Sequence, residues 1–288
     1  MFENKKYADK ENCQRSLLII IATKFNIKKT KLQWRMTIPL VGLNFDLNLS
    51  EEEFFMTKNP YIRAGCKDIW NAFMVCGANF SANDIPICPT IVKNIPKYLI
   101  SYTQAKTIFN KRKKAGDKDF FENAFVHFYI DDYKFDGKSG IWVGYGKSEE
   151  ILQHFAGIIT PDFSTCADFP EPLKVYNTYR MRAFGYWHGK ILGGAVINNV
   201  RWGTPETFKY CFDGIEKNSI VSIGTVASNL KNPQNRKIFS AGFEKMLEVL
   251  NPHTVIVYGS DKYPCFDDVR EKIKIVRFRS ETDLALRG

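Results

Sequence analysis

Four short apolar runs in the second half of the chain are each followed by polar residues and then by a helix-like segment. They span residues 157–160, 194–197, 220–224 and 255–257. Continuous apolar runs of this length that alternate with helical segments are typical of buried parallel strands. The pattern therefore predicts an α/β fold with a mostly parallel sheet of alternating βα units. The loops after the strands are expected to gather at one edge of that sheet, where ligands bind.

Other segments extend this pattern in both directions. Residues 126–130, 141–143 and 273–278 are predicted strands, and Asp131, Asp132 and the pair Asp136-Gly137 predict a hairpin turn after the first of them. The predicted helices span residues 101–112, 148–155, 173–187, 205–212, 235–250 and 264–272. A barrel-like sheet and an open doubly wound sheet both fit these elements.

The beginning of the chain differs from the rest. Residues 1–58 are predicted to form a basic N-terminal extension with short strand and helix elements, and residues 59–288 are predicted to form the α/β domain. Residues 36–45 alternate as an extended segment does, and Ser50 begins a capping-box pattern for a helix.

Composition excludes several classes of protein. The longest apolar run, residues 17–22, has six residues, whereas a membrane span needs roughly 20. Seven cysteines without a CxxC pair argue against a disulfide framework, so we expect a cytoplasmic protein without a membrane partner. The chain has neither a GxGxxG nor a Walker-type loop, which disfavours dinucleotide and P-loop nucleotide cofactors.

The net charge of +10 is concentrated in two segments. Residues 1–35 carry nine Lys or Arg against three acids, and residues 93–118 carry eight against one. Such segments favour an anionic partner, usually nucleic acid. The alternative is a solvated surface rich in lysine. The candidate contacts to a nucleic-acid backbone are Lys111, Arg112, Lys113 and Lys114.

Asp162 is the first candidate for catalysis. It follows the strand predicted at residues 157–160, and Pro161 stiffens the backbone before it. A carboxylate at the end of a strand can act as a nucleophile or a general base. The alternative is a turn or helix cap, because Asp often accepts hydrogen bonds from nearby backbone N–H groups.

A second candidate group lies after the strand at residues 194–197. Asn199 could read the edge of a base, Arg201 could clamp a phosphate or carboxylate, and Trp202 could stack on a base. We therefore assign Asn199 and Arg201 to the catalytic set with Asp162, and Trp202 to substrate binding. The alternative is a loop in which Trp202 packs into the core and Arg201 pairs with Glu206.

Two arginines lie on the helix predicted at residues 173–187. Arg180 and Arg182 alternate with aromatic residues, which suits contact with nucleic acid. Aromatic residues at this spacing are more often part of a core, and we favour that interpretation. The remaining candidate substrate-binding residues lie at or just beyond the ends of predicted strands: Ser164, Thr225, Tyr258 and Ser260.

A metal site has weaker support. Asp131, Asp132 and Asp162 could together hold Mg²⁺, but we favour the hairpin turn for the first two. The spacings of His and Cys along the chain fit no known zinc pattern. The sequence therefore predicts no metal ligands and no cofactor.

Seven short segments form a recognisable set of motifs: NPYIRAGC at 59–66, FYIDD at 128–132, ITPDFS at 159–164, YNTYRMR at 176–182, NVRWG at 199–203, CFDG at 211–214 and VYGS at 257–260. Together they resemble an uncharacterised family, domain of unknown function 4417, which is common in phages and mobile elements of Firmicutes. The resemblance covers residues 59–280 and implies an intracellular protein of a phage or mobile element, without an established activity. Residues 190–194 depart from the expected shorter turn.

Three hypotheses remain open. The first is an enzyme acting on nucleic acid or a nucleotide, which would cleave a glycosidic or phosphate ester bond. The second is a non-catalytic DNA-binding replication or regulatory factor, and the third is a phage protein that inhibits a host system by binding a host protein.

Overall fold

The computed structural model describes residues 65–92 and 94–285. The chain divides into two compact units, Met1–Gly77 and Ala78–Gly288. The predicted boundary at residue 58, the extended segment at 36–45 and the helix start at Ser50 lie outside the described residues. In the first unit, the described residues form one 3-10 helix, η2 (Ala72–Val75). The Asp68 carboxylate accepts hydrogen bonds from the N–H groups of Trp70 and Ala72 at its start.

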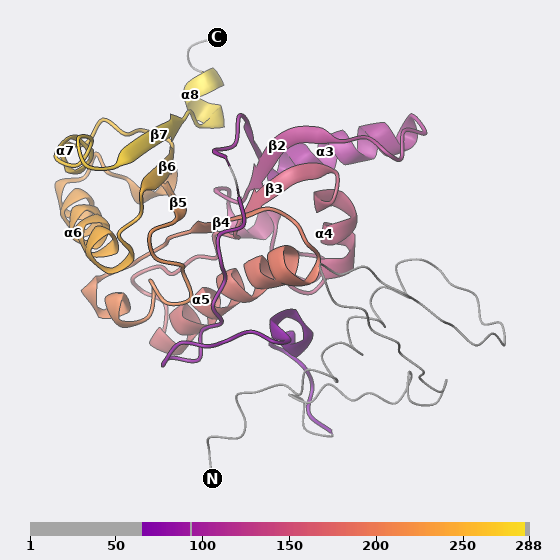
Figure 1. Cartoon of the computed structure of the whole chain (residues 1–288), viewed down its shortest axis with the longest axis horizontal. Helices are drawn as coiled ribbons and strands as arrows, with labels where there is room; N and C mark the ends of the chain where they lie inside the picture. The colour runs from indigo at the N-terminus through magenta and orange to yellow at the C-terminus, as the bar shows by residue number, and fades with distance from the viewer. Residues whose placement is uncertain (1–64, 93, 286–288) are drawn as a thin grey trace. The chain divides into compact units, whose positions relative to one another are not determined.

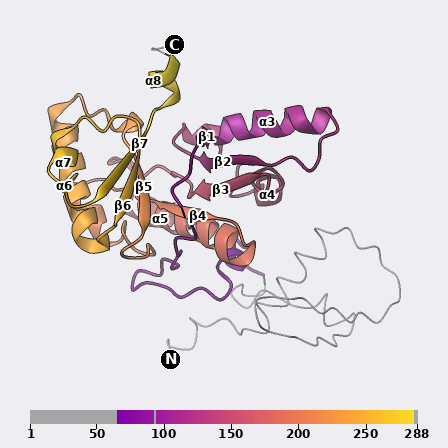
Figure 2. The same cartoon turned by 45° about the horizontal axis from the view of Figure 1, so that its top comes forward.

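The second unit is built on a seven-stranded sheet in which every pair of neighbouring strands is parallel. The strands lie side by side in chain order, and the sheet curls into a half-barrel (Figures 1 and 2). This order confirms the barrel-like alternative, since a doubly wound sheet reverses its strand order at a switch point. The strands are β1 (Leu99–Ser101), β2 (Glu122–His127), β3 (Phe155–Ile159), β4 (Val196–Asn199), β5 (Ile220–Gly224), β6 (Thr254–Tyr258) and β7 (Lys274–Phe278).

Helices connect the strands. The α-helices are α3 (Tyr102–Lys114), α4 (Tyr145–Leu152), α5 (Glu171–Tyr186), α6 (Pro233–Leu250), α7 (Pro264–Asp267) and α8 (Glu281–Ala285). Shorter turns are the 3-10 helices η3 (Asp132–Lys134), η5 (Pro205–Lys209) and η6 (Val226–Ser228), and the π-helical turn η4 (Trp187–Ile191). The turn η4 includes the first residues of the segment 190–194, where the sequence departs from the expected shorter turn.

Side chains on alternate strand positions form two hydrophobic layers. On one face of β5 and β6, Val221 and Val255 pack with Phe243 of α6 and Phe266 of α7. On the opposite, concave face, isoleucines and Phe125 from β2 to β6 form a second cluster. Burial of each large apolar side chain contributes about 1.5–3 kcal/mol, so these layers hold the curled sheet and fix the carboxyl ends of its strands.

Helix caps fix the positions of α3 and α6. Ser101 forms a capping box with Gln104 at the start of α3. The Asn232 side chain accepts hydrogen bonds from the N–H groups of Gln234 and Asn235 at the start of α6, where Pro233 occupies the first helical position.

The segment before β1 lies against β4. The residues Ile91 and Val196 pair as an antiparallel bridge, and Asn198 Nδ2 donates a hydrogen bond to the Cys88 carbonyl. This segment thus covers buried positions of β4.

Two predicted elements are wrong. Residues 141–143 form a turn instead of a strand, because Gly140 approaches the backbone of Asp136 so closely that a Cβ would lie 2.5 Å from it. The predicted hairpin at Asp131 and Asp132 is absent from the described sheet, whose strands are all parallel, and η3 occupies that position.

Two further features bear on the class of protein. Among the described residues, none of the helices has the length and apolar character that crossing a membrane requires. Cys76 is disulfide-bonded, and the other five cysteines in this part of the chain are free thiols.

Candidate functional site

A chain of polar side chains crosses the carboxyl edge of the half-barrel. Asn199, the last residue of β4, donates from Nδ2 to Asp162 Oδ1 over 2.8 Å. The other carboxylate oxygen of Asp162 accepts from Arg201 Nη1 over 2.6 Å. These contacts unite the three residues assigned to the catalytic set and correct the predicted alternative in which Arg201 pairs with Glu206.

Tyr129 extends this chain toward β5. Its hydroxyl forms hydrogen bonds with Asn199 Oδ1 over 3.0 Å and with Ser222 Oγ over 2.7 Å. The ring lies over Gly224, where a Cβ would approach it to 2.7 Å, so only glycine at this position admits the tyrosine. The site therefore combines residues from the ends of β2, β3, β4 and β5.

Backbone contacts fix the position of Asn199. Its N–H donates to Thr160 Oγ1 over 2.8 Å, and its carbonyl accepts from Arg182 Nη1 over 2.9 Å. Thr160 and Arg182 thus hold Asn199 between Tyr129 and Asp162, and neither of these two residues lines the adjacent pocket.

Burial dominates the electrostatics of this chain. It raises the pKa of Asp162 above the ordinary value for a carboxyl group, and the neighbouring Arg201 guanidinium and the Asn199 hydrogen bond act in the opposite direction. Burial also raises the pKa of Tyr129 well above its usual range, and the Asp162 charge adds to that effect. The tyrosine is a neutral hydroxyl at every physiological pH.

A pocket of about 220 Å³ opens beside these residues. Asp162, Asn199, Arg201 and Trp202 form part of its wall. Its volume is below the roughly 300–1,000 Å³ of pockets that enclose drug-sized ligands, so it suits a small group or one end of a larger molecule. Thr165, Cys166, Ala167 and Asn235 also line the pocket.

Trp202 has two roles in this wall. It lines the pocket, and its ring packs on Phe239 at 5.0 Å between centroids. A Cβ at Gly242 would lie 2.2 Å from the indole ring. The absence of a side chain at Gly242 therefore leaves room for Trp202 to pack against α6. Trp202 therefore packs against the core and also lines the pocket, and its stacking on a base stays a prediction.

Arg180 and Arg182 do not join the pocket wall. Arg180 is buried beside Asp136, with which it forms an ion pair of 2.8 Å, and its guanidinium lies 3.7 Å from the centroid of the Phe163 ring. Arg182 is fully buried and donates to three backbone carbonyls. Ser164 binds Asp132 through both its N–H and its hydroxyl.

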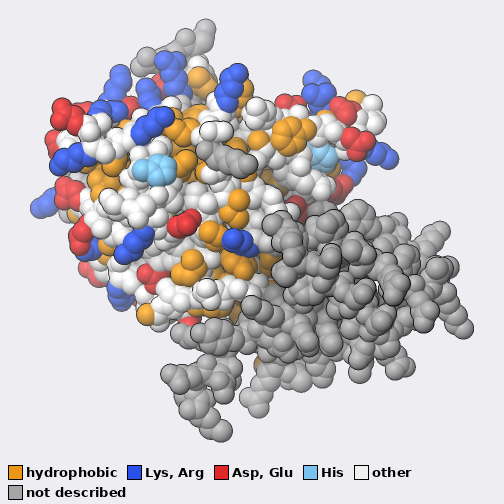
Figure 3. All heavy atoms as spheres, viewed as in Figure 1, with side chains coloured by type: hydrophobic (Ala, Val, Ile, Leu, Met, Phe, Trp, Pro, Cys, Tyr) orange, Lys and Arg blue, Asp and Glu red, His pale blue; other side chains and the backbone are white. Residues whose placement is uncertain are grey.

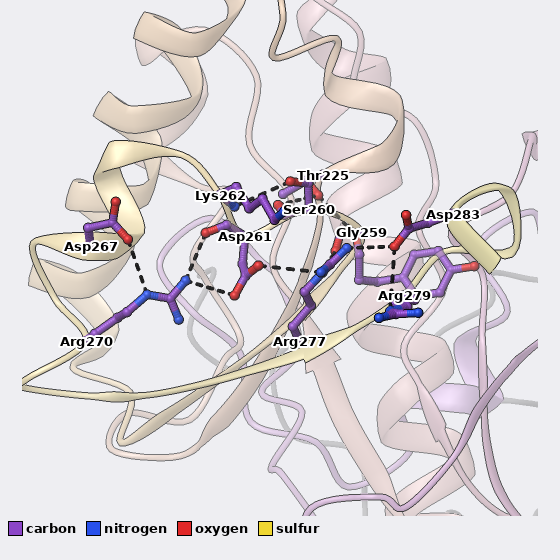
Figure 4. A network of polar contacts seen from close by, with 11 residues as sticks. Thr225, Gly259, Ser260, Asp261, Lys262, Asp267, Arg270, Arg277, Arg279 and Asp283 are labelled. Atoms are coloured by element: carbon purple, nitrogen blue, oxygen red, sulfur yellow. Dashed lines mark hydrogen bonds and ion pairs between the residues drawn. The ribbon is translucent and has the colours of Figure 1, made fainter. Parts of the chain in front are cut away.

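Thr225, Tyr258 and Ser260 form a separate cluster at the ends of β5 and β6. Figure 4 shows Thr225 and Ser260 of this cluster. Thr225 Oγ1 donates to the Ser260 carbonyl over 3.0 Å, across Gly259, whose φ of +116° requires glycine. Tyr258 stacks on Tyr129 at 5.3 Å between centroids, so this cluster is in contact with the polar chain but does not line the pocket.

Ion pairs reinforce the same corner of the molecule. Arg277 of β7 pairs with Asp261 and with Asp283 of α8, and Asp261 also pairs with Arg270 (Figure 4). Partly exposed pairs of this kind contribute little individually, but together they connect the loop after β6 to β7 and α8.

The basic segment Lys111–Lys114 lies at the end of α3. Because α3 leaves the carboxyl end of β1 and returns to the start of β2, this segment lies toward the opposite edge of the sheet from Asp162. Arg112 pairs with Asp117 and Glu122, and Lys113 pairs with Glu150. On the face drawn in Figure 3, basic and acidic side chains are likewise interspersed.

The three acids considered for Mg²⁺ have other partners, and that of Asp162 is Arg201. Asp131 pairs with Lys134 at 2.8 Å, and Asp132 accepts the two hydrogen bonds from Ser164. Among the described residues, no three His, Cys, Asp or Glu side chains are grouped so that they could hold a metal ion.

Sequence reasoning missed Tyr129 and Thr165. Tyr129 could have been found as a polar aromatic residue immediately after a strand, since that position carried the other candidates. Thr165 follows Ser164 in the same loop and has no distinguishing signal in the sequence.

Comparisons with known proteins bear on the family. Two proteins named Gene 1 protein are similar to the chain. The one from Mycobacterium phage D29 is 32% identical over 139 residues, which cover 48% of this chain and 49% of the relative. The one from Mycobacterium phage L5 is 29% identical over 197 residues, which cover 66% and 79%. The chain thus spans about half the length of the D29 relative, and a search of solved structures finds no match.

The family model described as Domain of unknown function (DUF4417) matches residues 80–279. This match includes every strand of the half-barrel and every residue of the polar chain. It therefore confirms the resemblance noted from the sequence motifs, and the chain belongs to this family.

Proposed function

We propose that the protein binds a nucleotide, or one end of a nucleic-acid strand, in the pocket at the carboxyl edge of the half-barrel. The observation that carries this proposal is the Arg201 side chain in the pocket wall, oriented by Asp162 and next to Trp202. Arg201 supplies a fixed charge and Trp202 supplies an aromatic surface, a combination that suits a phosphate and a base. The proposal places the protein in the cytoplasm, where such ligands are abundant.

Arg201 retains donors for a ligand. Its guanidinium has five N–H donors, and within the described residues it forms one ion pair, with Asp162. The side chain is 25% exposed. Asp162 therefore fixes the plane of the guanidinium while the remaining donors stay available.

Replacement of Arg201 by Gln is expected to weaken nucleotide binding by about tenfold or more, because a hydrogen bond to a charged group contributes roughly 1.5–3 kcal/mol. The measurement is a titration of the full chain with nucleoside monophosphates and with single- and double-stranded DNA and RNA, at low and moderate salt. Lys272→Gln, which removes an exposed cation before β7, is the matched control and should bind as the wild type does. Equal affinities of the Arg201→Gln and wild-type proteins would contradict the proposal.

Catalysis at this site is a second candidate, and the raised pKa of Asp162 favours it. A buried carboxyl group whose pKa moves toward neutrality can act as a general acid or base. Each carboxylate oxygen accepts one hydrogen bond from the protein and keeps a second lone pair. The bond cleaved would be the glycosidic or phosphate ester bond of the bound nucleotide.

If the protein turns over a bound nucleotide, Asp162→Asn is expected to lower kcat by about 10²–10⁴-fold, the usual contribution of a general acid or base. The measurement is the release of free base and of inorganic phosphate, with and without Mg²⁺, from each ligand that binds. Asp267→Asn, which changes an exposed acid of α7, should leave kcat unchanged. Release at the wild-type rate by Asp162→Asn would exclude Asp162 from the chemistry.

A further inference from the structure

Two loops and the first turn of a helix meet around one side of the pocket. Thr165, Cys166 and Ala167 come from the loop between β3 and α5, Arg201 comes from the loop after β4, and Asn235 comes from the first turn of α6. Successive βα units therefore supply groups to one small space, as they do in sites for anionic ligands at the carboxyl edge of parallel sheets.

Thr165 has a hydroxyl group without a partner. The residue is 3% exposed, and Oγ1 is buried with no hydrogen-bond partner in the described part of the chain. A buried hydroxyl left in this state costs about 1–3 kcal/mol, and Thr165 is a residue of the pocket wall. A ligand that accepts a hydrogen bond there would remove this cost.

Lys174 adds a buried positive charge behind the same loop. The residue is 6% exposed, and its ammonium group donates to the Ala167 carbonyl over 2.8 Å. Within the described residues it forms no ion pair of 4.0 Å or less, and exposed Glu206 interacts with it electrostatically. Asp162 is the one carboxylate in the pocket wall, while Asp132 and Glu206 act on Arg201 and Lys174 from outside it.

The helix α6 contributes in the same direction. It has 18 residues, and Asn235 in its first turn lies in the pocket wall. The N-terminus of a helix of this length carries about half a positive charge. The Asn232 side chain already accepts the N–H groups of Gln234 and Asn235, so α6 contributes this partial charge and no direct hydrogen bond from those groups. The unpartnered Thr165 hydroxyl belongs to the wall of the same pocket.

We propose that this pocket holds a phosphate monoester group between Arg201 and Thr165, with the N-terminal end of α6 and Lys174 behind the loop supplying positive charge. The inference rests on the proposed function and specifies which part of the ligand these residues bind. A phosphate monoester carries a charge of about −1.5 to −2 and three acceptor oxygens. It therefore matches a site with two cations and a hydroxyl donor better than a carboxylate, which has two oxygens and a single charge.

Cys166 provides a direct report on occupancy. Its thiol is free and exposed, and the residue lines the pocket. Cys66 is also free and exposed but is not part of the pocket wall. The experiment treats the full chain with iodoacetamide at increasing concentrations of inorganic phosphate and measures alkylation of the two cysteines by peptide mass spectrometry. Phosphate is expected to slow alkylation of Cys166 at least fivefold and to leave Cys66 unchanged.

Thr165→Val tests the role of the hydroxyl. Valine has the shape of threonine and removes a group that has no partner in the protein, so folding should be preserved. The phosphate concentration that half-protects Cys166 is expected to rise roughly five- to tenfold, as the loss of one hydrogen bond to an anion predicts. Lys174→Met should raise it as well, whereas Thr107→Val on α3 should not. An unchanged midpoint in Thr165→Val and in Lys174→Met would overturn the assignment.

Further ligands distinguish this inference from the proposed function. The same assay is run with a nucleoside, its 5′-monophosphate, and a short oligonucleotide with and without a 5′-phosphate. Protection that needs the phosphate supports the inference, and the two phosphorylated ligands separate a free nucleotide from a strand end. Equal protection by the nucleoside and its monophosphate would overturn the phosphate site and leave the proposed function standing. Protection by inorganic phosphate alone would support the phosphate site and contradict nucleotide binding, and no protection by any ligand would overturn both.

Discussion

Arg182→Met is expected to lower the free energy of unfolding by about 3–5 kcal/mol. Arg182 is fully buried and donates from Nε, Nη1 and Nη2 to the carbonyls of Asp213, Asn199 and Cys211. Methionine fills much of the same space but leaves these carbonyls without a donor, and each buried group left unsatisfied costs about 1–3 kcal/mol. The measurement is urea unfolding followed by tryptophan fluorescence.

The large expected loss of unfolding free energy follows from how Arg182 is buried and hydrogen-bonded. Burial lowers the pKa of Arg182 to about 10, so the group remains a cation at neutral pH, and backbone carbonyls instead of a carboxylate compensate its charge. Arg112→Met is the matched control, because Arg112 is 47% exposed and its ion pairs contribute little. A change below about 1 kcal/mol in Arg182→Met, together with weaker ligand binding, would restore Arg182 to the substrate-binding set.

The architecture of the sheet could be predicted from the sequence because its strands are buried on both faces. Residues 220–224 and 255–257 are apolar without alternation, and both lie within strands, β5 and β6. The strand order could not be predicted in the same way, since open and curled sheets use the same local pattern. Residues 141–143 were wrongly predicted as a strand because they are apolar, as a buried strand is. Trp142 is indeed buried, but it lies in a turn, where its Nε1 donates a hydrogen bond to the Tyr176 hydroxyl.

The candidate site was predicted only as far as position along each strand could show it. Asp162, Asn199 and Arg201 were chosen because each lies at the end of a strand, and they are in contact. Burial decides the rest. The interior position of Arg182 depends on how the loop at 211–214 covers α5. The lack of a partner for the buried Thr165 hydroxyl depends on which neighbours the folded loop supplies. Residue type and spacing do not encode either of these.

A pH titration of stability is expected to show a second large effect, centred on His127. The side chain is 1% exposed, its Nδ1 accepts the N–H of Tyr129 over 3.2 Å, and its ring lies 4.1 Å from that of Tyr258. Burial lowers the pKa of His127 to about 3 from an ordinary value of 6.5. The folded protein therefore keeps this imidazole neutral through a pH range in which the unfolded chain protonates it.

The sign of the effect follows from proton linkage. Between pH 6.5 and pH 3 the unfolded chain binds the proton more readily, so the free energy of unfolding falls as the pH falls. The contribution of His127 is complete above pH 6.5, and about 3 kcal/mol of it is lost between pH 7.5 and pH 4. The measurement is urea unfolding at a series of pH values in that range.

Carboxyl groups titrate over the lower part of the same range, so the effect of His127 must be isolated by comparison. In His127→Asn the amide oxygen can still accept the Tyr129 N–H, but no group at this position titrates. The unfolding free energy of the wild type minus that of this variant should fall by about 3 kcal/mol from pH 7.5 to pH 4. If the difference for His127→Asn were constant, the ring would be accessible to protons in the folded state. Protonation of Nδ1 in the folded state would then remove the acceptor of the Tyr129 N–H group.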